Sequence, residues 1–200
     1  MYKAVIFDLG KVLIDFDFKP GFRALEGLCP FSAADIPKRI ASTGLVERFE
    51  TGLVEPRDFF RELSAHLRLE VDYDRFCRIW SSIFSEVLIP ESMLQGLAAR
   101  YRLLLLSNTN ALHFEMIRAN YPLLRHFHAL ILSYEVKAMK PHPEIFQAAV
   151  DRAGCRPEEC FYTDDIADYV AAARRLGIDA VQFRSAGQLQ AELTARGIVW

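Results

Sequence analysis

The stretch KAVIFDLGKVLID, residues 3–15, decides the fold, because an apolar run leads directly into a carboxylate and then a glycine. Val5, Ile6 and Phe7 favour a β-strand, and an unbroken apolar run is typical of a parallel strand covered on both faces. Ligands bind at the carboxyl ends of such strands, so Asp8 is a candidate for chemistry. Gly10 would allow a tight turn or the close approach of a ligand. Taken alone, Asp8 could equally cap a turn.

The composition is that of an ordinary globular protein, with 52% hydrophobic and 25% charged residues. A net charge of -2 gives no electrostatic reason to expect nucleic acid or an anionic membrane as a partner. The four cysteines form no CxxC pair, which favours reduced thiols in a cytoplasmic protein. We expect no signal peptide, because a strand begins near residue 2, and the apolar run 103–106 is too short to span a bilayer.

Downstream of residue 90, helical and strand patterns alternate, which is typical of βαβ crossovers and a parallel sheet. The predicted strands cover residues 102–106, 129–132, 160–163 and 178–183. The predicted helices cover residues 90–100, 111–120, 143–153, 167–176 and 186–196. We therefore expect an α/β fold with a Rossmann-like parallel sheet and helices on both faces.

Between the first strand and residue 88, the sequence predicts an insertion made only of helices. Prolines and glycines break residues 16–30, which suit a flap, while Ser32, Pro56 and Asp72 can each open a helix. The third of these helices has an apolar stripe, which indicates core packing, at Phe76, Ile79, Trp80, Ile83 and Phe84. We expect a core of residues 1–15 and 89–200, with an insertion over residues 16–88.

Polar side chains fall at the ends of two more predicted strands. Ser107 and Asn108 stand at a strand-to-helix turn, where free backbone N–H groups favour an anion such as phosphate. Asp164 and Asp165 follow a short buried strand, and a hard cation such as Mg²⁺ would relieve the repulsion between two adjacent carboxylates. Helix capping by Ser107 and an acidic turn at the aspartates are the alternative interpretations.

Lys140 stands in AMKPHPEIF, just before a predicted helix. A lone lysine is usually a solvated surface charge. Together with Asp8, Ser107 and the aspartate pair, however, it would complete a nucleophilic carboxylate, a phosphate-binding hydroxyl, a cation and a metal site. Two anions cannot approach unless charge is neutralised, and Mg²⁺ and Lys140 would neutralise it. One active site explains the set better than several coincidental helix caps.

These residues resemble the four loop motifs of the haloacid dehalogenase superfamily, in the same order along the chain. FDLG around Asp8 looks like motif one, LSNTN with Ser107 like motif two, MKP with Lys140 like motif three, and TDDIAD with Asp164 like motif four. The helical insertion over residues 16–88 looks like the family's small cap. Within the superfamily, FDLGKVLIDFDF and LSNTNALH are most similar to the bacterial α-D-glucose-1-phosphate phosphatase subgroup.

The resemblance implies a Mg²⁺-dependent hydrolase of small phosphorylated metabolites, including sugar phosphates. We also expect a monomer or a homodimer. Asp8 would attack phosphorus to form an aspartyl-phosphate, while Ser107, Asn108 and Lys140 hold the phosphoryl group. The implied ligands of Mg²⁺ are Asp8, the Gly10 carbonyl, Asp164 and Asp165.

Gly10 departs from the family's pattern. Most phosphatases of the superfamily carry a second aspartate two positions after the nucleophile, where it protonates the leaving group and later activates water. Loss of such an acid/base typically costs about 10²- to 10⁴-fold in rate. Asp15 and His113 are candidate substitutes, with structural roles as the alternative. The role of Lys11 stays open.

Two other functions stay open. A 2-haloacid dehalogenase also lacks the second aspartate, although dehalogenases typically lack a carboxylate pair like the one seen here. A member that binds a phosphorylated ligand or a protein without turnover would fit Gly10 together with Tyr169, which stands where relatives often have Asn or Asp. Specificity would lie in the cap and flap, where a solvated helix face is the alternative for the side chains that could meet sugar hydroxyls. These are Arg39, Glu47, Arg48 and Glu50.

Overall fold

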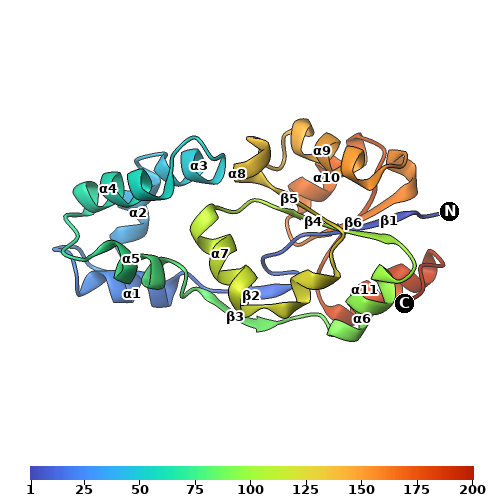
Figure 1. Ribbon diagram of the computed structural model, residues 1–200, viewed down its shortest axis with the longest axis horizontal. Coiled ribbons are helices and arrows are strands. Elements are labelled where there is room, and N and C mark those ends of the chain that lie inside the picture. Colours follow the sequence, from blue (N-terminus) through green and yellow to red (C-terminus); the bar gives the residue numbers. More distant parts are fainter.

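The computed structural model describes residues 1–200 and contains a five-stranded parallel sheet in the order β5-β4-β1-β6-β7 (Figure 1). Its strands are β1 (Ala4–Phe7), β4 (Arg102–Ser107), β5 (Ala129–Leu132), β6 (Cys160–Asp164) and β7 (Asp179–Gln182). β1 is the middle strand of the sheet, and all four of its side chains are fully buried. The expected α/β fold with a parallel sheet is confirmed.

Two layers of helices cover the sheet, one on each face. Successive side chains of β1 point to opposite faces and pack against one layer or the other. Val5 and Phe7 belong to one apolar cluster, with α6 (Glu91–Ala98), α7 (Ala111–Asn120) and α11 (Ala186–Ala195). Ala4 and Ile6 belong to the other, with α9 (Pro143–Ala153) and α10 (Ala167–Arg175). The remaining short helices are α8 (Ser133–Val136), η1 (Pro122–His126) and η2 (Pro157–Glu159).

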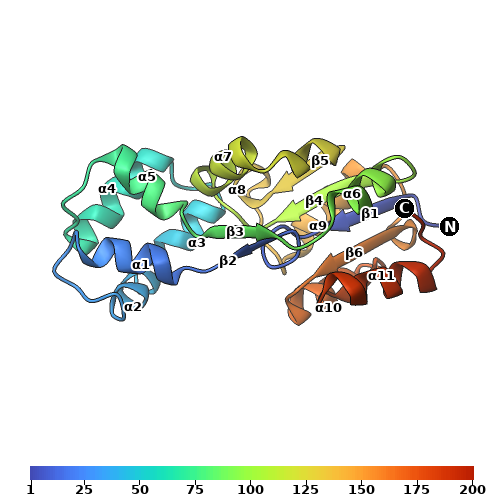
Figure 2. The same cartoon turned by 90° about the horizontal axis from the view of Figure 1, so that it is seen from below.

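Five helices form the insertion, which lies beside the sheet at one end of the molecule (Figures 1 and 2). They are α1 (Lys19–Glu26), α2 (Ile36–Ala41), α3 (Leu45–Glu50), α4 (Pro56–Leu67) and α5 (Tyr73–Trp80). Their apolar faces build a cluster of their own, in which the ring centroids of Phe49 and Phe59 are stacked 4.1 Å apart. We propose residues 16–88 as the extent of this cap and residues 1–15 and 89–200 as the core.

Both connections between cap and core are β-strands, so the prediction of an insertion made only of helices is wrong there. β2 (Ile14–Phe16) and β3 (Phe84–Val87) pair as an antiparallel ribbon. The predicted helix after Asp72 stops at Trp80, because the chain turns at Ser81. Phe84 therefore pairs with Phe16 instead of continuing the helical stripe.

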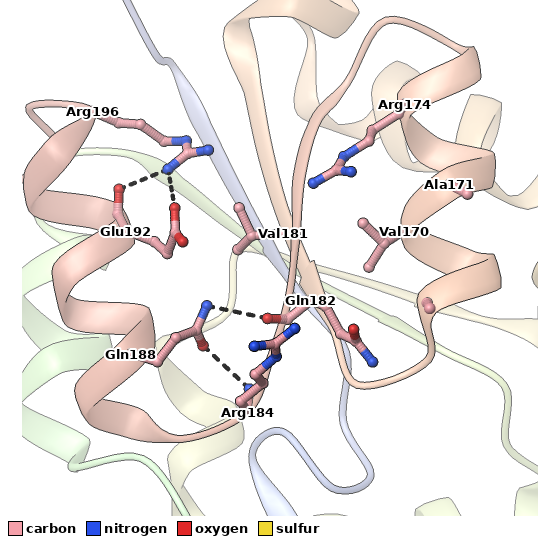
Figure 3. Close-up of a pocket in the computed structure, with 10 residues that line it drawn as sticks. Val170, Ala171, Arg174, Val181, Gln182, Arg184, Gln188, Glu192 and Arg196 are labelled. Atoms are coloured by element: carbon pink, nitrogen blue, oxygen red, sulfur yellow. Dashed lines mark hydrogen bonds and ion pairs between the residues drawn. The ribbon is translucent and has the colours of Figure 1, made fainter.

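β7 forms one edge of the sheet, and side chains cover its outward carbonyl groups (Figure 3). Arg174 Nε donates to the Ala180 carbonyl at 2.8 Å, and Gln188 Nε2 donates to the Gln182 carbonyl at 3.1 Å. The Gln182 side chain turns the other way and donates to the Asp165 carbonyl at 2.8 Å. A groove of about 480 Å³ runs along this edge, lined by residues of β7, α10 and α11.

None of the helices combines the length and the apolar character needed to cross a membrane.

Candidate active site

The polar residues predicted at strand ends converge on one edge of the sheet. β1 pairs with both β4 and β6, and Phe7 lies opposite Leu105 and Thr163. Asp8, which follows Phe7, is therefore flanked by the carboxyl ends of two neighbouring strands. The Asp8 N–H donates to the Thr163 carbonyl at 3.0 Å, which extends the sheet pairing by one residue. The backbone thus fixes where this carboxylate stands.

Lys140 lies at the centre of the site, with a side chain that is only 1% exposed. Its ammonium donates to Asp8 Oδ1 at 2.6 Å and to Asp164 Oδ2 at 2.7 Å. Burial alone would lower the pKa of Lys140, but these two carboxylates outweigh it and raise that pKa above its ordinary value. Burial also raises the pKa of Asp8 to about 7, against the opposing effect of Lys140. The lysine is therefore a permanent cation between two buried acids.

Asp164 accepts hydrogen bonds from three protein donors. Besides Lys140, its carboxylate accepts hydrogen bonds from the Tyr162 hydroxyl and from the Ile166 N–H, the latter at 2.8 Å. Asp165 has no such partners and is half-buried. Burial, followed by the charge of Asp164, raises the pKa of Asp165. Of the two adjacent acids, Asp165 is thus the one whose carboxylate accepts no hydrogen bond from a protein side chain.

Carboxylate oxygens of Asp8, Asp164 and Asp165 all lie within 4.8 Å of one another. Three carboxylates face one ammonium, which leaves negative charge to be balanced. An oxygen-only donor set suits a hard divalent cation such as Mg²⁺. The site therefore fits the predicted metal, with Asp8 and Asp165 offering the free oxygens. The Gly10 carbonyl, two residues beyond Asp8, stays a proposed ligand.

The Asn108 side chain holds the loop that carries Lys140 against the end of β4. Its side-chain Oδ1 accepts from the Lys140 N–H at 2.8 Å, and its Nδ2 donates to the Lys140 carbonyl at 3.0 Å. The ring of Tyr169 lies under the ammonium, 5.1 Å from Nζ to the ring centroid. Because the Asn108 side chain is occupied by Lys140, its proposed contact with substrate would be made by its backbone N–H. Tyr169 packs against the Lys140 ammonium and helps to hold it in place.

The Ser107 hydroxyl is buried, with only a long 3.4 Å contact to the Asn108 carbonyl, so it has capacity to bind a phosphoryl oxygen. Ser133 was missed by sequence reasoning. Its hydroxyl accepts from the Thr109 N–H at 2.9 Å and lies 2.6 Å from the Glu50 carbonyl of the cap. Ser133 follows the apolar strand β5 just as Ser107 ends β4, and this shared pattern could have revealed it.

Neither suggested substitute for the missing acid/base is arranged as a proton carrier. Asp15 accepts from Lys11 Nζ at 2.6 Å, and this hydrogen bond is the main reason that its pKa is lowered. His113 is buried against Trp80, with parallel rings 5.6 Å apart, and burial lowers its pKa to about 4. The Phe16 ring, which lies over Gly10, belongs to the ribbon that connects the cap.

A Rossmann-like core, a helical cap inserted after the first strand, and a lysine between carboxylates at the strand ends define a capped α/β hydrolase. The chain belongs to the haloacid dehalogenase-like hydrolases, whose family model matches residues 2–177. The expected superfamily and the prediction of a hydrolase are confirmed.

Two relatives match nearly the whole chain. A D-ribitol-5-phosphate phosphatase of Bacteroides thetaiotaomicron is 28% identical over 204 residues, covering 97% of this chain and 98% of the relative. A crystal structure of a family enzyme from the same species, in complex with magnesium and inorganic phosphate, superposes with a TM-score of 0.82. That structure is 28% identical and covers 92% of this chain and 96% of its own.

A more distant structure, an L-2-haloacid dehalogenase of Xanthobacter autotrophicus, shares the fold. It has a TM-score of 0.64 and 21% identity, covering 100% of this chain and 85% of its own. The glucose-1-phosphate phosphatase subgroup stays a prediction.

Proposed function

We propose that this protein is a Mg²⁺-dependent phosphomonoesterase that hydrolyses small phosphorylated metabolites, with sugar and polyol phosphates as the main class. The main support is the position of Lys140, whose ammonium bridges Asp8 and Asp164 inside a cluster of three carboxylates. This arrangement suits a dianionic substrate, because it combines a fixed cation with a donor set for a divalent metal. The names of the relatives agree with this class.

Asp8 is the proposed nucleophile. One of its oxygens attacks phosphorus, the bond from phosphorus to the leaving oxygen breaks, and the leaving oxygen takes a proton from solvent water. The product is an aspartyl-phosphate on Asp8. Water then attacks this acyl phosphate, releases inorganic phosphate and regenerates the carboxylate. Lys140 stays charged throughout, because both of its partners are buried acids.

The remaining residues bind and position. Ser107 Oγ and the backbone N–H of Asn108 hold the phosphoryl oxygens, while the Asn108 side chain keeps Lys140 in place. Asp8, Asp165 and the Gly10 carbonyl would hold Mg²⁺, and Asp164 would bind it directly or through water while also orienting Lys140. When bound, the metal supplies positive charge that offsets the repulsion between the substrate and the carboxylates.

Release of phosphate from p-nitrophenyl phosphate tests the proposal. The wild type with Mg²⁺ should turn over this substrate, and Asp8→Asn should abolish turnover while leaving the melting temperature within a few degrees. If both proteins were inert across a broad panel of phosphorylated metabolites, a binding protein without turnover would be the better description. Release of halide from 2-haloacids without Mg²⁺ would instead favour a dehalogenase.

A panel that includes D-ribitol 5-phosphate and D-glucose 1-phosphate addresses the finer prediction. The first compound is the substrate in the name of the relative, and the second is the one implied by the sequence motifs. A preference for the second would support the predicted subgroup, whereas a preference for the first would place the chain with its curated relative.

A further inference from the structure

Cys155 and Cys160 are two thiols that the proposed active site does not use. Their sulfur atoms lie 3.5 Å apart, at the two ends of the turn that joins α9 to β6. All four cysteines of the chain are free thiols, and Cys29 and Cys77 lie in the cap, where neither contacts another cysteine. Residues 155 and 160 are therefore the one pair of thiols in contact.

The turn between the two cysteines is closed by hydrogen bonds of its own. The Arg156 N–H donates to the Glu159 carboxylate at 3.0 Å, and the Glu159 N–H donates to the Arg156 carbonyl at 2.9 Å. The Lys3 N–H donates to the Glu159 carbonyl at 2.8 Å, which ties the turn to the start of β1. The sulfur atoms of a disulfide are about 2.0 Å apart, so the two thiols need to approach by only about 1.5 Å.

The two thiols differ in their access to solvent. Cys155 is half-buried and lines an open hollow of about 630 Å³ on the surface, together with Lys3, Arg156 and Glu159. Cys160 has no exposed surface, and burial, followed by the contact with Cys155, raises the pKa of its thiol. A thiol that is buried and kept protonated is inert toward reagents in solution. A reagent from solvent can thus reach Cys155, whereas Cys160 can react only with an atom that already touches it.

We propose that Cys155 and Cys160 form a reversible oxidation site, in which Cys155 reacts with a hydroperoxide and Cys160 converts the product into a disulfide. This inference goes beyond the phosphatase function and does not depend on it. The role of Cys160 is protective. A sulfenic acid left alone is oxidised further to a sulfinic acid, which thiols do not reduce, whereas a disulfide is returned to two thiols by a dithiol.

One molecule of hydrogen peroxide supplies both oxidising equivalents. The Cys155 thiolate attacks one peroxide oxygen and the O–O bond breaks, so that Cys155 becomes a sulfenic acid. The departing hydroxide takes up the proton lost by the thiol and leaves as water. The Cys160 sulfur then attacks the Cys155 sulfur, the S–O bond breaks, and the hydroxide leaves as water with the Cys160 proton. Two thiols and one peroxide thus give one disulfide and two molecules of water.

The thiol pair lies at the end of β6 opposite the active site. Cys160 is the first residue of β6, and Asp164 is the last. With a rise of about 3.3 Å per residue, the two residues are about 13 Å apart. Changes separated by more than about 10 Å usually act independently. We therefore expect the disulfide to link the end of α9 to the start of β6 without displacing the catalytic residues, and its formation can be measured separately from turnover.

Peroxide treatment of the full chain, followed by peptide mass spectrometry, tests the inference. After exposure to hydrogen peroxide and alkylation of the remaining thiols, we expect a disulfide between Cys155 and Cys160, with a loss of two hydrogen atoms, that dithiothreitol reverses. Cys29 and Cys77 should form no disulfide, because neither touches another thiol. Cys29→Ser, in the cap, is the matched control and should form the same disulfide as wild type.

Dimedone, which captures sulfenic acids, separates the roles of the two thiols. In Cys160→Ala no thiol stands beside Cys155, so we expect at least about tenfold more dimedone adduct on Cys155 than in wild type, and a sulfinic acid after longer exposure. Cys155→Ser should leave Cys160 as an unmodified thiol, because the buried sulfur is out of reach of the peroxide.

Melting temperatures show whether these variants are folded. If Cys160→Ala does not fold, the peptide map of the wild type decides by itself. A wild-type pair that stays unreacted, or a sulfinic acid on Cys155 of the wild type without any disulfide, would overturn the inference. The same holds for a disulfide that joins Cys155 to Cys29 or Cys77, and for oxidation of Cys160 in Cys155→Ser as fast as in wild type.

Discussion

The Phe16 ring occupies the space into which a side chain at Gly10 would extend: a Cβ built on Gly10 would lie 2.6 Å from Phe16 Cε1. The position at which most phosphatases of the superfamily hold their acid/base is therefore filled by an aromatic ring from the cap connection. Phe16 is held in turn by Phe84 and Phe18, with ring centroids 6.1 and 5.2 Å away.

The pairing of Gly10 with Phe16 predicts that Gly10→Asp alone lowers both the melting temperature and kcat/KM, because the ring cannot move freely. The double variant Gly10→Asp with Phe16→Ala should recover stability and gain activity toward an alkyl phosphate such as β-glycerol phosphate. A positioned acid is worth about 10²-fold or more for such a poor leaving group. Phe16→Ala alone is the control. A Gly10→Asp protein as stable and active as wild type would contradict the steric conflict.

Removal of the central cation should leave two buried carboxylates facing each other. We expect Lys140→Met to abolish activity and to lower the free energy of unfolding in metal-free buffer by about 3–5 kcal/mol, the usual cost of breaking a buried ion pair. Urea unfolding measures the change. Lys3→Met, which breaks a pair between Glu159 and a lysine that is 62% exposed, should cost far less. Similar losses in the two variants would argue against a central role for Lys140.

Metal binding should appear as thermal stabilisation. At a Mg²⁺ concentration of about 100 times Kd, binding adds about 2.7 kcal/mol, or roughly 5–10 °C for a domain of this size. Asp165→Asn should remove most of this shift and most of the activity, because it deletes a free metal oxygen. Asp168→Asn, an exposed position one helical turn further on, should retain both. Equal shifts in the two variants would refute Asp165 as a ligand.

His113 should make the protein sensitive to mild acid. Its Nε2 lies 3.0 Å from the Trp80 carbonyl and its Nδ1 lies 3.1 Å from Asn110 Nδ2, which suits a neutral ring with Nε2 as donor. Its pKa of about 4 lies below the ordinary 6.5, so between these pH values the unfolded chain binds a proton that the folded chain does not. Stability is therefore lost as the pH falls from 6.5 toward 4, with a slope of up to about 1.4 kcal/mol per pH unit from this group.

Urea unfolding at several pH values tests this slope. His113→Gln should flatten the dependence over that range, although it also lowers stability at pH 7 by removing ring contacts. His142→Gln, at an exposed position, should leave the slope unchanged. A variant and wild type with identical slopes would mean that other groups control the acid sensitivity.

The junction between cap and core tolerates only glycine at residue 52. A Cβ there would lie 2.0 Å from the Tyr134 carbonyl oxygen, and φ is 68°. Gly44 has a similar φ of 62° with open space around it. Gly44→Ala should therefore cost only the left-handed strain of about 1–2 kcal/mol, whereas Gly52→Ala should cost more and lower kcat/KM about tenfold or more. Proteolysis of the cap and steady-state kinetics would show the difference.

The positions of the candidate site residues could be predicted because each follows an apolar strand. The carboxyl ends of parallel strands meet at one edge, so Asp8, Ser107 and Asp164 had to come together once the strands were recognised. Lys140 arrives from a loop, so no strand end placed it, and its convergence with the acids was inferred from the need to neutralise their charge. Its geometry depends on Asn108, whose side chain holds the loop from a strand 32 residues earlier.

The connections of the cap could not be read from local patterns. Phe84 continues the apolar spacing of the helix after Asp72, yet it pairs with Phe16, which is distant in sequence. Periodicity reports which side chains are buried, and it does not report which partner buries them. Phe16 is subject to the same limit, because the local pattern of FDLGKVLIDFDF does not predict that its ring fills the space beside Gly10.

The edge strand β7 has a bearing on how the protein behaves at high concentration. An exposed strand edge can pair with a second chain, whose N–H groups would donate hydrogen bonds to the free carbonyl oxygens. Here the carbonyls of Ala180 and Gln182 are already bonded to Arg174 and Gln188. A foreign strand would have to displace both side chains before it could pair, so this end of the sheet is protected against the strand-by-strand growth that leads to aggregates.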